Sequence, residues 1–220
     1  MTVKESLNQR FSCRKFKDQA VPREVIDAIL RQSQQTPSWC NTQPWAVDIV
    51  EGELLATLSA ELVALAEAET PINPDIPFPG EYTGAFRERR KVCGLQLYQS
   101  VGIQKGDRER TKDQGLENFR FFSAPHVAFI STPKSLGIYG ALDCGLYISS
   151  FLLSAQELGV STIAQAALAS YPDVIRDHLR IPDDRDIVCG ISFGFCDETN
   201  PVNSYRTERE DIQLTTNYHR

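Results

Sequence analysis

The sequence predicts an α+β fold in which helices pack on a central sheet. Apolar residues recur at helical spacing along most of the chain, whereas only three short segments alternate or run apolar as strands do. These strands do not alternate regularly with helices, which disfavours a doubly wound parallel sheet. A chain of 220 residues is long enough to bury a substantial core in one domain. We therefore expect a single domain over 1–220, with residues 197–220 as an extended, polar carboxy-terminal tail.

The first third of the chain predicts three helices and one strand. Apolar spacing indicates a first helix that ends near Phe11 and a second that begins at Pro22, because proline suits the first helical turn. Large apolar residues alternate with small or charged ones over 45–49, which predicts a strand. Leucines at helical spacing then predict a helix over 53–69.

Residues 70–80 contain four prolines and predict an irregular loop, because proline fixes φ and removes a donor. This loop is too apolar for a solvated linker, so we expect it to pack on the protein as a lid. The elements after it are two charged helices, a buried strand, a long apolar helix, a short helix with a capping box and a last buried strand, over 82–104, 107–122, 126–131, 138–158, 170–179 and 187–195. The basic run at 87–91 is interpreted as a solvated helix face.

The predicted helix over 138–158 is apolar on most sides, so it belongs in the middle of the protein or in a subunit interface. Asp143 lies within it and needs a buried partner, such as an arginine of another element. Cys144 and Cys189 lie in apolar runs and are interpreted as inert core thiols.

The composition excludes several classes of function. Acidic residues outnumber basic ones by 29 to 23, and without clustered cations the chain is a poor nucleic-acid binder. No apolar stretch approaches the ~20 residues of a membrane span, and the amino terminus lacks the apolar core of a signal peptide. Six cysteines without a CxxC pair read as free thiols in a reducing cytoplasm. Three scattered histidines predict no metal site.

Two pairs of arginines are candidate phosphate ligands. Arg10 and Arg14 are four residues apart with Ser12 between them, and guanidinium forks match phosphate oxygens. Arg206 and Arg209 form a similar pair after the last predicted strand. The alternatives are chance occurrence on a solvated surface for the first pair and a polar tail for the second.

Asn41 and Gln43 lie in a proline-bounded turn that begins at Pro37 and leads into a strand. Each side-chain amide offers both a donor and an acceptor, so the pair suits a flat heterocycle whose edge alternates N–H and C=O. The alternative is an Asx-type turn. Trp39 and Trp45 beside them are interpreted as core residues, with a stacking surface as the alternative.

Small residues dominate the segment 161–168, Ser-Thr-Ile-Ala-Gln-Ala-Ala-Leu. They let a ligand approach the backbone, whose N–H groups can hold a ring or a developing anion. The alternative is close packing between a helix and a strand.

Taken in order, these segments resemble the FMN-dependent nitroreductase family. The matching features are RFSCRKF near residue 10, PSWCNTQPW at 37–45, the long apolar helix before TIAQAAL, and the closing NPVNSYRTER. They span nearly the whole chain, in the family's order and spacing. The resemblance implies a nitroreductase-like α+β subunit with a central mixed or antiparallel sheet. It also implies an intertwined homodimer with a swapped or clasping carboxy-terminal tail.

The resemblance assigns FMN contacts to four segments. Arg10 and Ser12 should bind the phosphate and ribityl chain, with Arg14 near the flavin N1–C2=O edge, and the segment 37–43 often comes from the partner subunit. The stretch from Gln165 should lie along the ring and donate to N5, although it lacks the family's usual Pro or Gly, which leaves the donating N–H open. The implied cofactor-binding residues are Arg10, Phe11, Ser12, Arg14, Pro37, Ser38, Asn41, Gln43, Gln165, Ala166, Ala167, Arg206 and Arg209.

The activity that the resemblance implies is ping-pong reduction by FMN, with NADH or NADPH as donor and a nitroaromatic or quinone-like molecule as the small aromatic acceptor. Because the cofactor carries the hydride chemistry, no catalytic side chain and no metal are expected. Two alternatives remain open. The same flavin scaffold can perform dehalogenation, enone reduction or flavin fragmentation, or the chain can be a non-catalytic flavin-binding or sensing protein.

Overall fold

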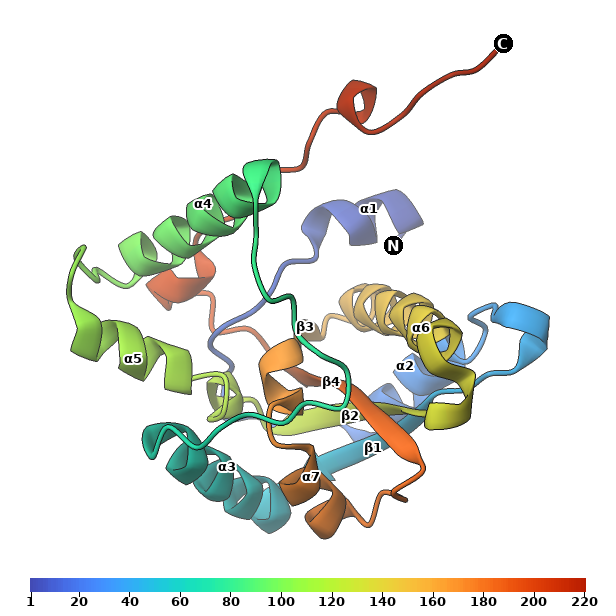
Figure 1. Ribbon diagram of the computed structural model, residues 1–220, viewed down its shortest axis with the longest axis horizontal. Helices are drawn as coiled ribbons and strands as arrows, with labels where there is room; N and C mark the ends of the chain where they lie inside the picture. Colours follow the sequence, from blue (N-terminus) through green and yellow to red (C-terminus); the bar gives the residue numbers. More distant parts are fainter.

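A four-stranded antiparallel sheet forms the centre of the computed structural model, which describes residues 1–220 (Figure 1). The strand order is β1-β2-β4-β3, and every neighbouring pair runs antiparallel. The α+β prediction is confirmed, and of the two sheet types expected the antiparallel one is present. The strands are β1 (Ala46–Glu51), β2 (His126–Pro133), β3 (Ser161–Gln165) and β4 (Arg185–Gly194).

Strand β3 is the one strand that periodicity does not predict. Its five residues are mostly small or polar, and they pair with β4 from Ser161 opposite Gly194 to Gln165 opposite Gly190. Gly190 is required here because a Cβ at this position would overlap the Leu168 side chain, which packs directly on β4. The small-residue segment 161–168 therefore combines an edge strand with close packing against β4. Close packing was the alternative to a ligand-binding role for this segment.

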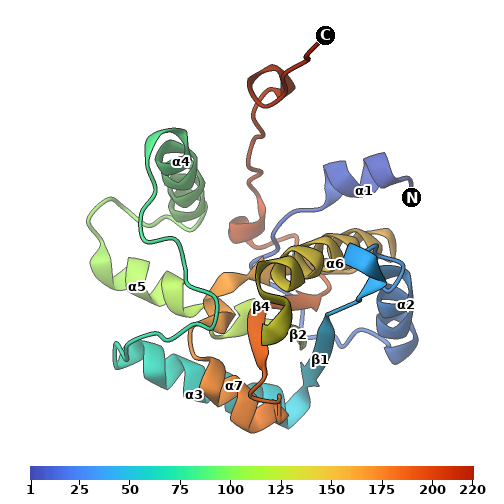
Figure 2. The same cartoon turned by 45° about the vertical axis from the view of Figure 1, so that its right-hand side comes forward.

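Helices cover both faces of the sheet (Figure 2). Alternate residues of β2 point to opposite faces. Ala128 and Ile130 join the core under α2 and α6, whereas Val127 and Phe129 join the core under α3 and α7. Each fully buried large side chain contributes about 1.5–3 kcal/mol. The helices are α1 (Val3–Gln9), α2 (Arg23–Ser33), α3 (Gly52–Glu67), α4 (Gly84–Ser100), α5 (Arg108–Leu116), α6 (Gly137–Glu157) and α7 (Pro172–Leu179).

The helix starts differ in part from the sequence prediction. Thr2 and Glu5 form a capping box that opens α1, which the apolar pattern does not reveal. The capping box expected at Ser170 is wrong, because the residue before α7 is Tyr171 and no side chain caps that helix. Pro172 at the first turn is sufficient to start α7 there.

The proline-rich loop over 70–80 is fixed to α7 and β4. Asp75 accepts bonds from Arg176 at 2.5 Å and from the backbone of Ile187 at 2.8 Å. Asn73 donates to Asp173 at 2.7 Å. The prediction that this loop packs on the protein is confirmed, and these contacts make it a strap that leads to α4, which stands away from the sheet (Figure 2). The basic run on α4 is exposed, as expected.

One side of α6 faces the sheet and the other is an apolar surface. Ile138 and Leu142 on the outer side are 86% and 57% exposed, and Leu146 and Tyr139 lie on the same side. The expectation that no stretch approaches the length of a membrane span is wrong for residues 134–157, which could cross a membrane by length and composition, a test that a core helix also passes. Trp39 extends this apolar surface, because its ring makes an edge-to-face contact with the Tyr139 ring, with the two ring centroids 4.3 Å apart.

Candidate functional site

Four arginines converge on one cavity of about 300 Å³. Its walls come from the first helix and the segment after it, from one residue of α4, and from the tail. No aspartate or glutamate lines it. The lining residues are Leu7, Asn8, Arg10, Phe11, Ser12, Arg14, Cys93, Tyr205, Arg206, Thr207 and Arg209. The structure thus brings together both arginine pairs singled out in the sequence.

Arg10 lacks the hydrogen-bond partners that the other three arginines have. Its Nε is buried and has no hydrogen-bond partner. Burial, and secondly the charge of Arg209, lower the pKa of the Arg10 guanidinium. A buried cationic donor without a partner is costly, so this atom marks a place for an anionic ligand.

The other three arginines already have partners within the chain. Arg14 Nη1 donates to the Ser12 carbonyl at 3.2 Å. The Arg206 guanidinium lies 3.6 Å from the centre of the Phe11 ring and donates to the Asn203 carbonyl. Arg209 Nη1 donates to the side chain and carbonyl of Thr207 at 3.0 and 3.2 Å. These neutral partners fix the side chains and leave their positive charges uncompensated.

The segment 12–16 is held against the sheet edge and the tail. Ser12 forms a parallel bridge with Thr162 of β3, and the Cys13 N–H donates to the Thr162 carbonyl at 3.0 Å. The Arg14 N–H donates to Asn203 Oδ1 at 2.7 Å. Asn203 is therefore a component of the site that residue type alone did not reveal, because it touches backbone and not the cavity's centre.

A left-handed turn holds the other side of the same segment. Phe121, Phe122 and Ser123 have φ of 55°, 53° and 62°, a conformation that costs roughly 1–2 kcal/mol per residue. The expectation of helix as far as residue 122 is wrong for this reason. Two hydrogen bonds to the segment 12–16 offset this cost. The Ser123 hydroxyl accepts one from Lys15 Nζ at 2.8 Å, and the Phe122 carbonyl accepts one from the Phe16 N–H.

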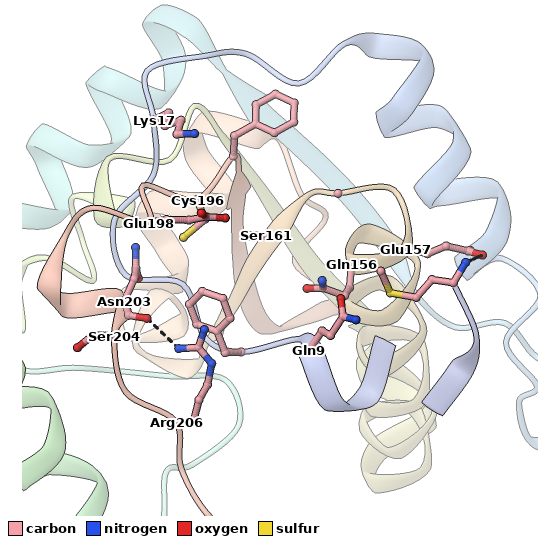
Figure 3. A pocket seen from close by; sticks show the side chains of 14 residues that line it. Gln9, Lys17, Gln156, Glu157, Ser161, Cys196, Glu198, Asn203, Ser204 and Arg206 are labelled. Atoms are coloured by element: carbon pink, nitrogen blue, oxygen red, sulfur yellow. Dashed lines mark hydrogen bonds and ion pairs between the residues drawn. The ribbon is translucent and has the colours of Figure 1, made fainter. Parts of the chain in front are cut away.

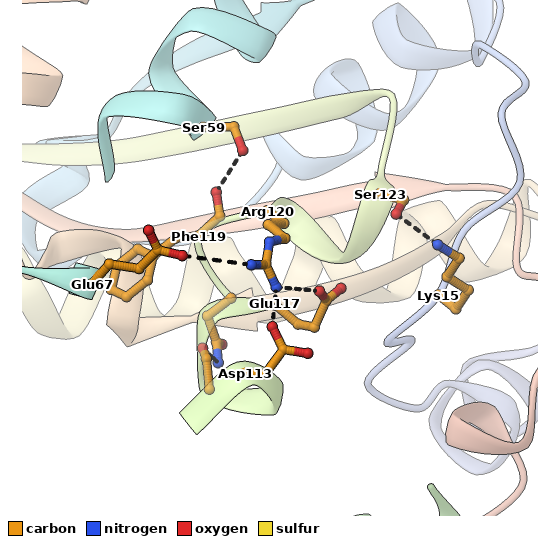
Figure 4. Close-up of polar contacts among 10 residues, drawn as sticks. Lys15, Ser59, Glu67, Asp113, Glu117, Phe119, Arg120 and Ser123 are labelled. Atoms are coloured by element: carbon orange, nitrogen blue, oxygen red, sulfur yellow. Dashed lines mark hydrogen bonds and ion pairs between the residues drawn. The ribbon is translucent and has the colours of Figure 1, made fainter. Parts of the chain in front are cut away.

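Polar contacts fix the approach to this turn (Figure 4). Arg120 donates to Asp113 at 2.8 Å and to Glu117 at 2.9 Å, and these two bonds raise the pKa of its guanidinium. Ser59 on α3 donates to the Phe119 carbonyl at 3.0 Å. The turn is therefore set between two anchored elements, which lets it position the segment that carries Arg14.

The turn with Asn41 and Gln43 is organised by Asp143 of α6. Both carboxylate oxygens of Asp143 lie 3.2 Å from the Trp39 N–H, and Thr42 donates at 3.5 Å. The expectation of an arginine partner for Asp143 is wrong, because backbone and hydroxyl donors satisfy it. Asn41 and Gln43 are exposed, with φ of 59° and 47°.

Ser38 Oγ accepts from the Gln43 N–H at 2.9 Å and so closes this turn, with Pro37 exposed before it. Trp39 is 56% exposed, so its assignment to the core is wrong, whereas Trp45 is buried as expected. The turn presents an exposed aromatic ring and two amides at the same place.

Within a single chain, the turn over 37–43 does not reach the arginine cavity. The turn contacts the start of α6 through Asp143, whereas the amino terminus before α1 contacts its end, with Met1 N at 3.8 Å from Glu157. About 20 Å of helix separates Asp143 from Glu157 at ~1.5 Å per residue. Figure 1 shows the two regions at opposite ends of α6.

The third predicted segment, 161–168, comprises β3 and the start of the 3₁₀ turn after it. The Gln165 side chain is buried and structural, since its amide donates to the Asn118 carbonyl at 3.0 Å and accepts from Ser192 at 2.5 Å. Ala166 and Ala167 begin a 3₁₀ turn and are exposed and half-buried. They follow the strand whose Thr162 bridges to Ser12, and neither of them lines the arginine cavity.

Comparison with known proteins gives a consistent result. The model of the Nitroreductase family matches residues 7–195. Nitroreductase NfnB of Mycolicibacterium smegmatis is 34% identical, over 96% of this chain and 90% of its own length. A 4-nitrobenzoate reductase of Pseudomonas putida is 34% identical over 95% and 92%. The crystal structure of the FMN-dependent nitroreductase NfnB from Mycobacterium smegmatis in complex with NADPH superposes with a TM-score of 0.94, at 32% identity, covering 99% of this chain and 97% of that one.

Proposed function

This chain belongs to the nitroreductase family, and we propose that it is an FMN-dependent oxidoreductase that uses NAD(P)H to reduce nitroaromatic or similarly flat acceptors. The donor and the acceptor bind in turn at one site, in a ping-pong sequence. Similarity to relatives named for FMN, NADPH and nitroaromatic reduction supports this proposal.

The buried, unpartnered Nε of Arg10 carries the cofactor assignment. A phosphate group in the 300 Å³ cavity would accept this N–H and offset the charge of the surrounding guanidinium groups. The absence of acidic side chains from the lining removes competition for these donors. The residues present therefore fit the phosphate end of FMN.

We assign the remaining contacts to the other segments that the resemblance to the family points to. Ser12 and Arg206 complete the phosphate end with Arg10 and Arg209. Arg14 supplies a fixed positive charge that favours a negatively charged edge of a bound ring. The backbone at Ala166 and Ala167 would lie along the ring. When bound, FMN supplies the hydride chemistry, so no side chain of this chain has to act as acid, base or nucleophile.

We assign the completion of each site to a second copy of the chain. The turn that carries Asn41 and Gln43 lies about 20 Å along α6 from the end that contacts the amino terminus, at ~1.5 Å per residue. The exposed apolar side of α6 provides a surface on which two copies can pack and exchange these turns. Ile212, Leu214 and Tyr218 in the tail are also exposed and suit a segment that clasps the partner.

The six cysteines are all free thiols, which supports the cytoplasm as the site of action.

The test is FMN binding by Arg10→Ala. We expect FMN to bind ~10–100-fold more weakly, because a hydrogen bond to a charged group contributes about 1.5–3 kcal/mol. Titration of stripped protein with FMN, followed by quenching of flavin fluorescence, measures this. Arg31→Ala, an exposed arginine on α2, is the matched control and should bind FMN normally. Unchanged affinity in Arg10→Ala would refute the phosphate assignment, and wild-type protein that ignores FMN would refute the function.

A further inference from the structure

Two free thiols meet beside the arginine cavity. Cys13 lies between Ser12 and Arg14, and Cys196 follows the end of β4. Both pack in one small apolar cluster with Phe16. Phe16 pairs directly opposite Cys196 in an antiparallel bridge.

The backbone on either side fixes the approach of these two thiols. Lys17 N donates to the Phe195 carbonyl at 2.8 Å, and Asp197 N donates to the Lys15 carbonyl at 3.1 Å. The two cysteines therefore belong to neighbouring, hydrogen-bonded segments, and a hydrogen bond joins their thiols.

The two thiols are not equivalent. Cys13 is fully buried and its sulfur lies 3.2 Å from the Lys15 carbonyl oxygen. Cys196 is half-buried and lines a cavity of about 700 Å³, together with Lys17 and Arg206 (Figure 3). A small polar oxidant in this cavity can thus reach Cys196, whereas Cys13 does not line it.

The electrostatics support the same division of roles. A hydrogen bond from the Cys13 thiol, opposed by burial and nearby carboxylates and helped by Arg206, lowers the pKa of Cys196. The same hydrogen bond and burial raise the pKa of Cys13. The thiolate is the reactive form of cysteine, so Cys196 is the sulfur that reacts first.

Another pair of neighbouring thiols provides an internal contrast. Cys144 and Cys189 are both buried in the main core, and burial raises their pKa values to about 11 and about 12. Neither lines the 700 Å³ cavity. They lack both the lowered thiol pKa and the access to a cavity that Cys196 has.

We propose that Cys13 and Cys196 form a peroxide-reactive dithiol that closes to an intramolecular disulfide. The Cys196 thiolate attacks one oxygen of a hydroperoxide, the O–O bond breaks, and Cys196 becomes a sulfenic acid while the other oxygen leaves as water or alcohol after taking a proton. The Cys13 sulfur then attacks the Cys196 sulfur. The S–OH bond breaks, and the Cys13 proton leaves with the hydroxide as a second molecule of water. The two sulfurs together lose two electrons, which reduce the peroxide.

The disulfide would link the segment that carries Arg10 and Arg14 to the strand that leads into the segment carrying Arg206 and Arg209. The chemistry requires only the two thiols and peroxide, so it stands independently of the proposed flavin activity.

The experiment is peptide mapping of the wild-type protein after titration with hydrogen peroxide. Remaining thiols are blocked with iodoacetamide before digestion without reductant. We expect a pair of peptides joined through Cys13 and Cys196 that separates on adding dithiothreitol. Cys144 and Cys189 should stay reduced, so their peptides carry either a free thiol or the iodoacetamide label. Cys40→Ser removes an exposed thiol outside the pair and should retain the linkage.

Two variants separate the roles of the sulfurs. Cys13→Ser should leave a sulfenic acid on Cys196 that dimedone traps, and Cys196→Ser should leave Cys13 unmodified. If Cys13→Ser does not fold, the wild-type map decides alone. Alkylation of both Cys13 and Cys196 at a peroxide dose that oxidises Cys40, or linkage of either to another cysteine, would overturn the proposal.

Discussion

The Asn203 side-chain oxygen accepts a hydrogen bond from the Arg14 N–H at 2.7 Å, across 189 residues of sequence. The same side chain donates to the carbonyls of Lys15 and Asp197, both at 2.9 Å. One buried amide therefore joins the amino-terminal segment, the end of β4 and the tail. It sets the spacing between the two arginine pairs.

Asn203→Ala should weaken both the fold and FMN binding. The substitution removes the acceptor of the Arg14 N–H and the donor to the Lys15 and Asp197 carbonyls, and a buried group left without a partner costs about 1–3 kcal/mol. We expect the free energy of unfolding to fall by ~2–4 kcal/mol. We also expect FMN affinity to fall about tenfold, because the arginines lose their relative placement. Urea unfolding and an FMN titration measure the two effects.

Asn217→Ala is the matched control for this variant, because Asn217 is exposed in the tail. It should leave stability and FMN affinity unchanged. Wild-type FMN affinity in folded Asn203→Ala would show that the amide does not position the arginines.

The sequence could indicate the arginines but not what places them. Arg10, Arg14, Arg206 and Arg209 have a residue type whose chemistry points to phosphate, and their spacing is visible in the chain. Asn203 acts on backbone atoms far away in sequence, and no local pattern records such a contact. The sequence pattern also does not predict the left-handed turn at 121–123, because tertiary contacts of Arg120 and Lys15 override the helical preference of these residues.

Asp143→Ala should disorganise the turn that carries Asn41 and Gln43. The buried carboxylate is the acceptor for the Trp39 N–H, and its loss leaves this donor without a partner. We expect a stability loss of about 1–3 kcal/mol. We also expect a lower catalytic efficiency with a nitroaromatic. Steady-state kinetics at saturating FMN measure this, with Glu24→Ala at an exposed position of α2 as the control. Unchanged kinetics in Asp143→Ala would exclude a positioning role for Asp143.

Asp143 shows where residue reasoning succeeds and fails. A carboxylate in an otherwise apolar helix predicts a buried polar partner, and one exists. The identity of the partner depends on which loop packs beside α6, and this is fixed only by tertiary structure. The same holds for Trp39, whose ring lies on the surface because its turn extends outward past Tyr139.

Stability should decrease as the pH falls below about 6.5 because of His126. Nε2 of this buried ring accepts from the Val21 N–H at 2.9 Å, and Nδ1 faces Glu51 at 2.9 Å. Burial, partly offset by Glu51, lowers the pKa of His126 from its ordinary value of 6.5. The unfolded chain therefore binds a proton at a higher pH than the folded chain does. The stabilisation is fully present above 6.5 and falls by up to ~1.4 kcal/mol per pH unit below it, until the folded ring is protonated.

Urea unfolding of wild type and His126→Gln at pH 8.0 and pH 5.5 tests this, because the variant cannot titrate at this position. The wild type should lose about 1 kcal/mol more than the variant between these conditions. Equal losses in the two proteins would assign the pH dependence to other groups.

Leu142→Lys should separate the proposed dimer and weaken FMN binding in the same protein. Leu142 is 57% exposed on the apolar side of α6, so a lysine is tolerated in one folded chain but places an unpaired charge in an interface built on that side. We expect sedimentation equilibrium to show a monomer, with a dissociation constant at least ~30-fold higher than in wild type, since hot-spot interface residues cost about 2 kcal/mol or more when they are lost. FMN should then be held by the arginine segment alone, without Asn41 and Gln43 of the other copy. Leu54→Lys, at an exposed leucine on α3, is the matched control and should remain a dimer with bound FMN. A monomeric Leu142→Lys that retains wild-type FMN affinity would mean that each chain forms a complete site by itself.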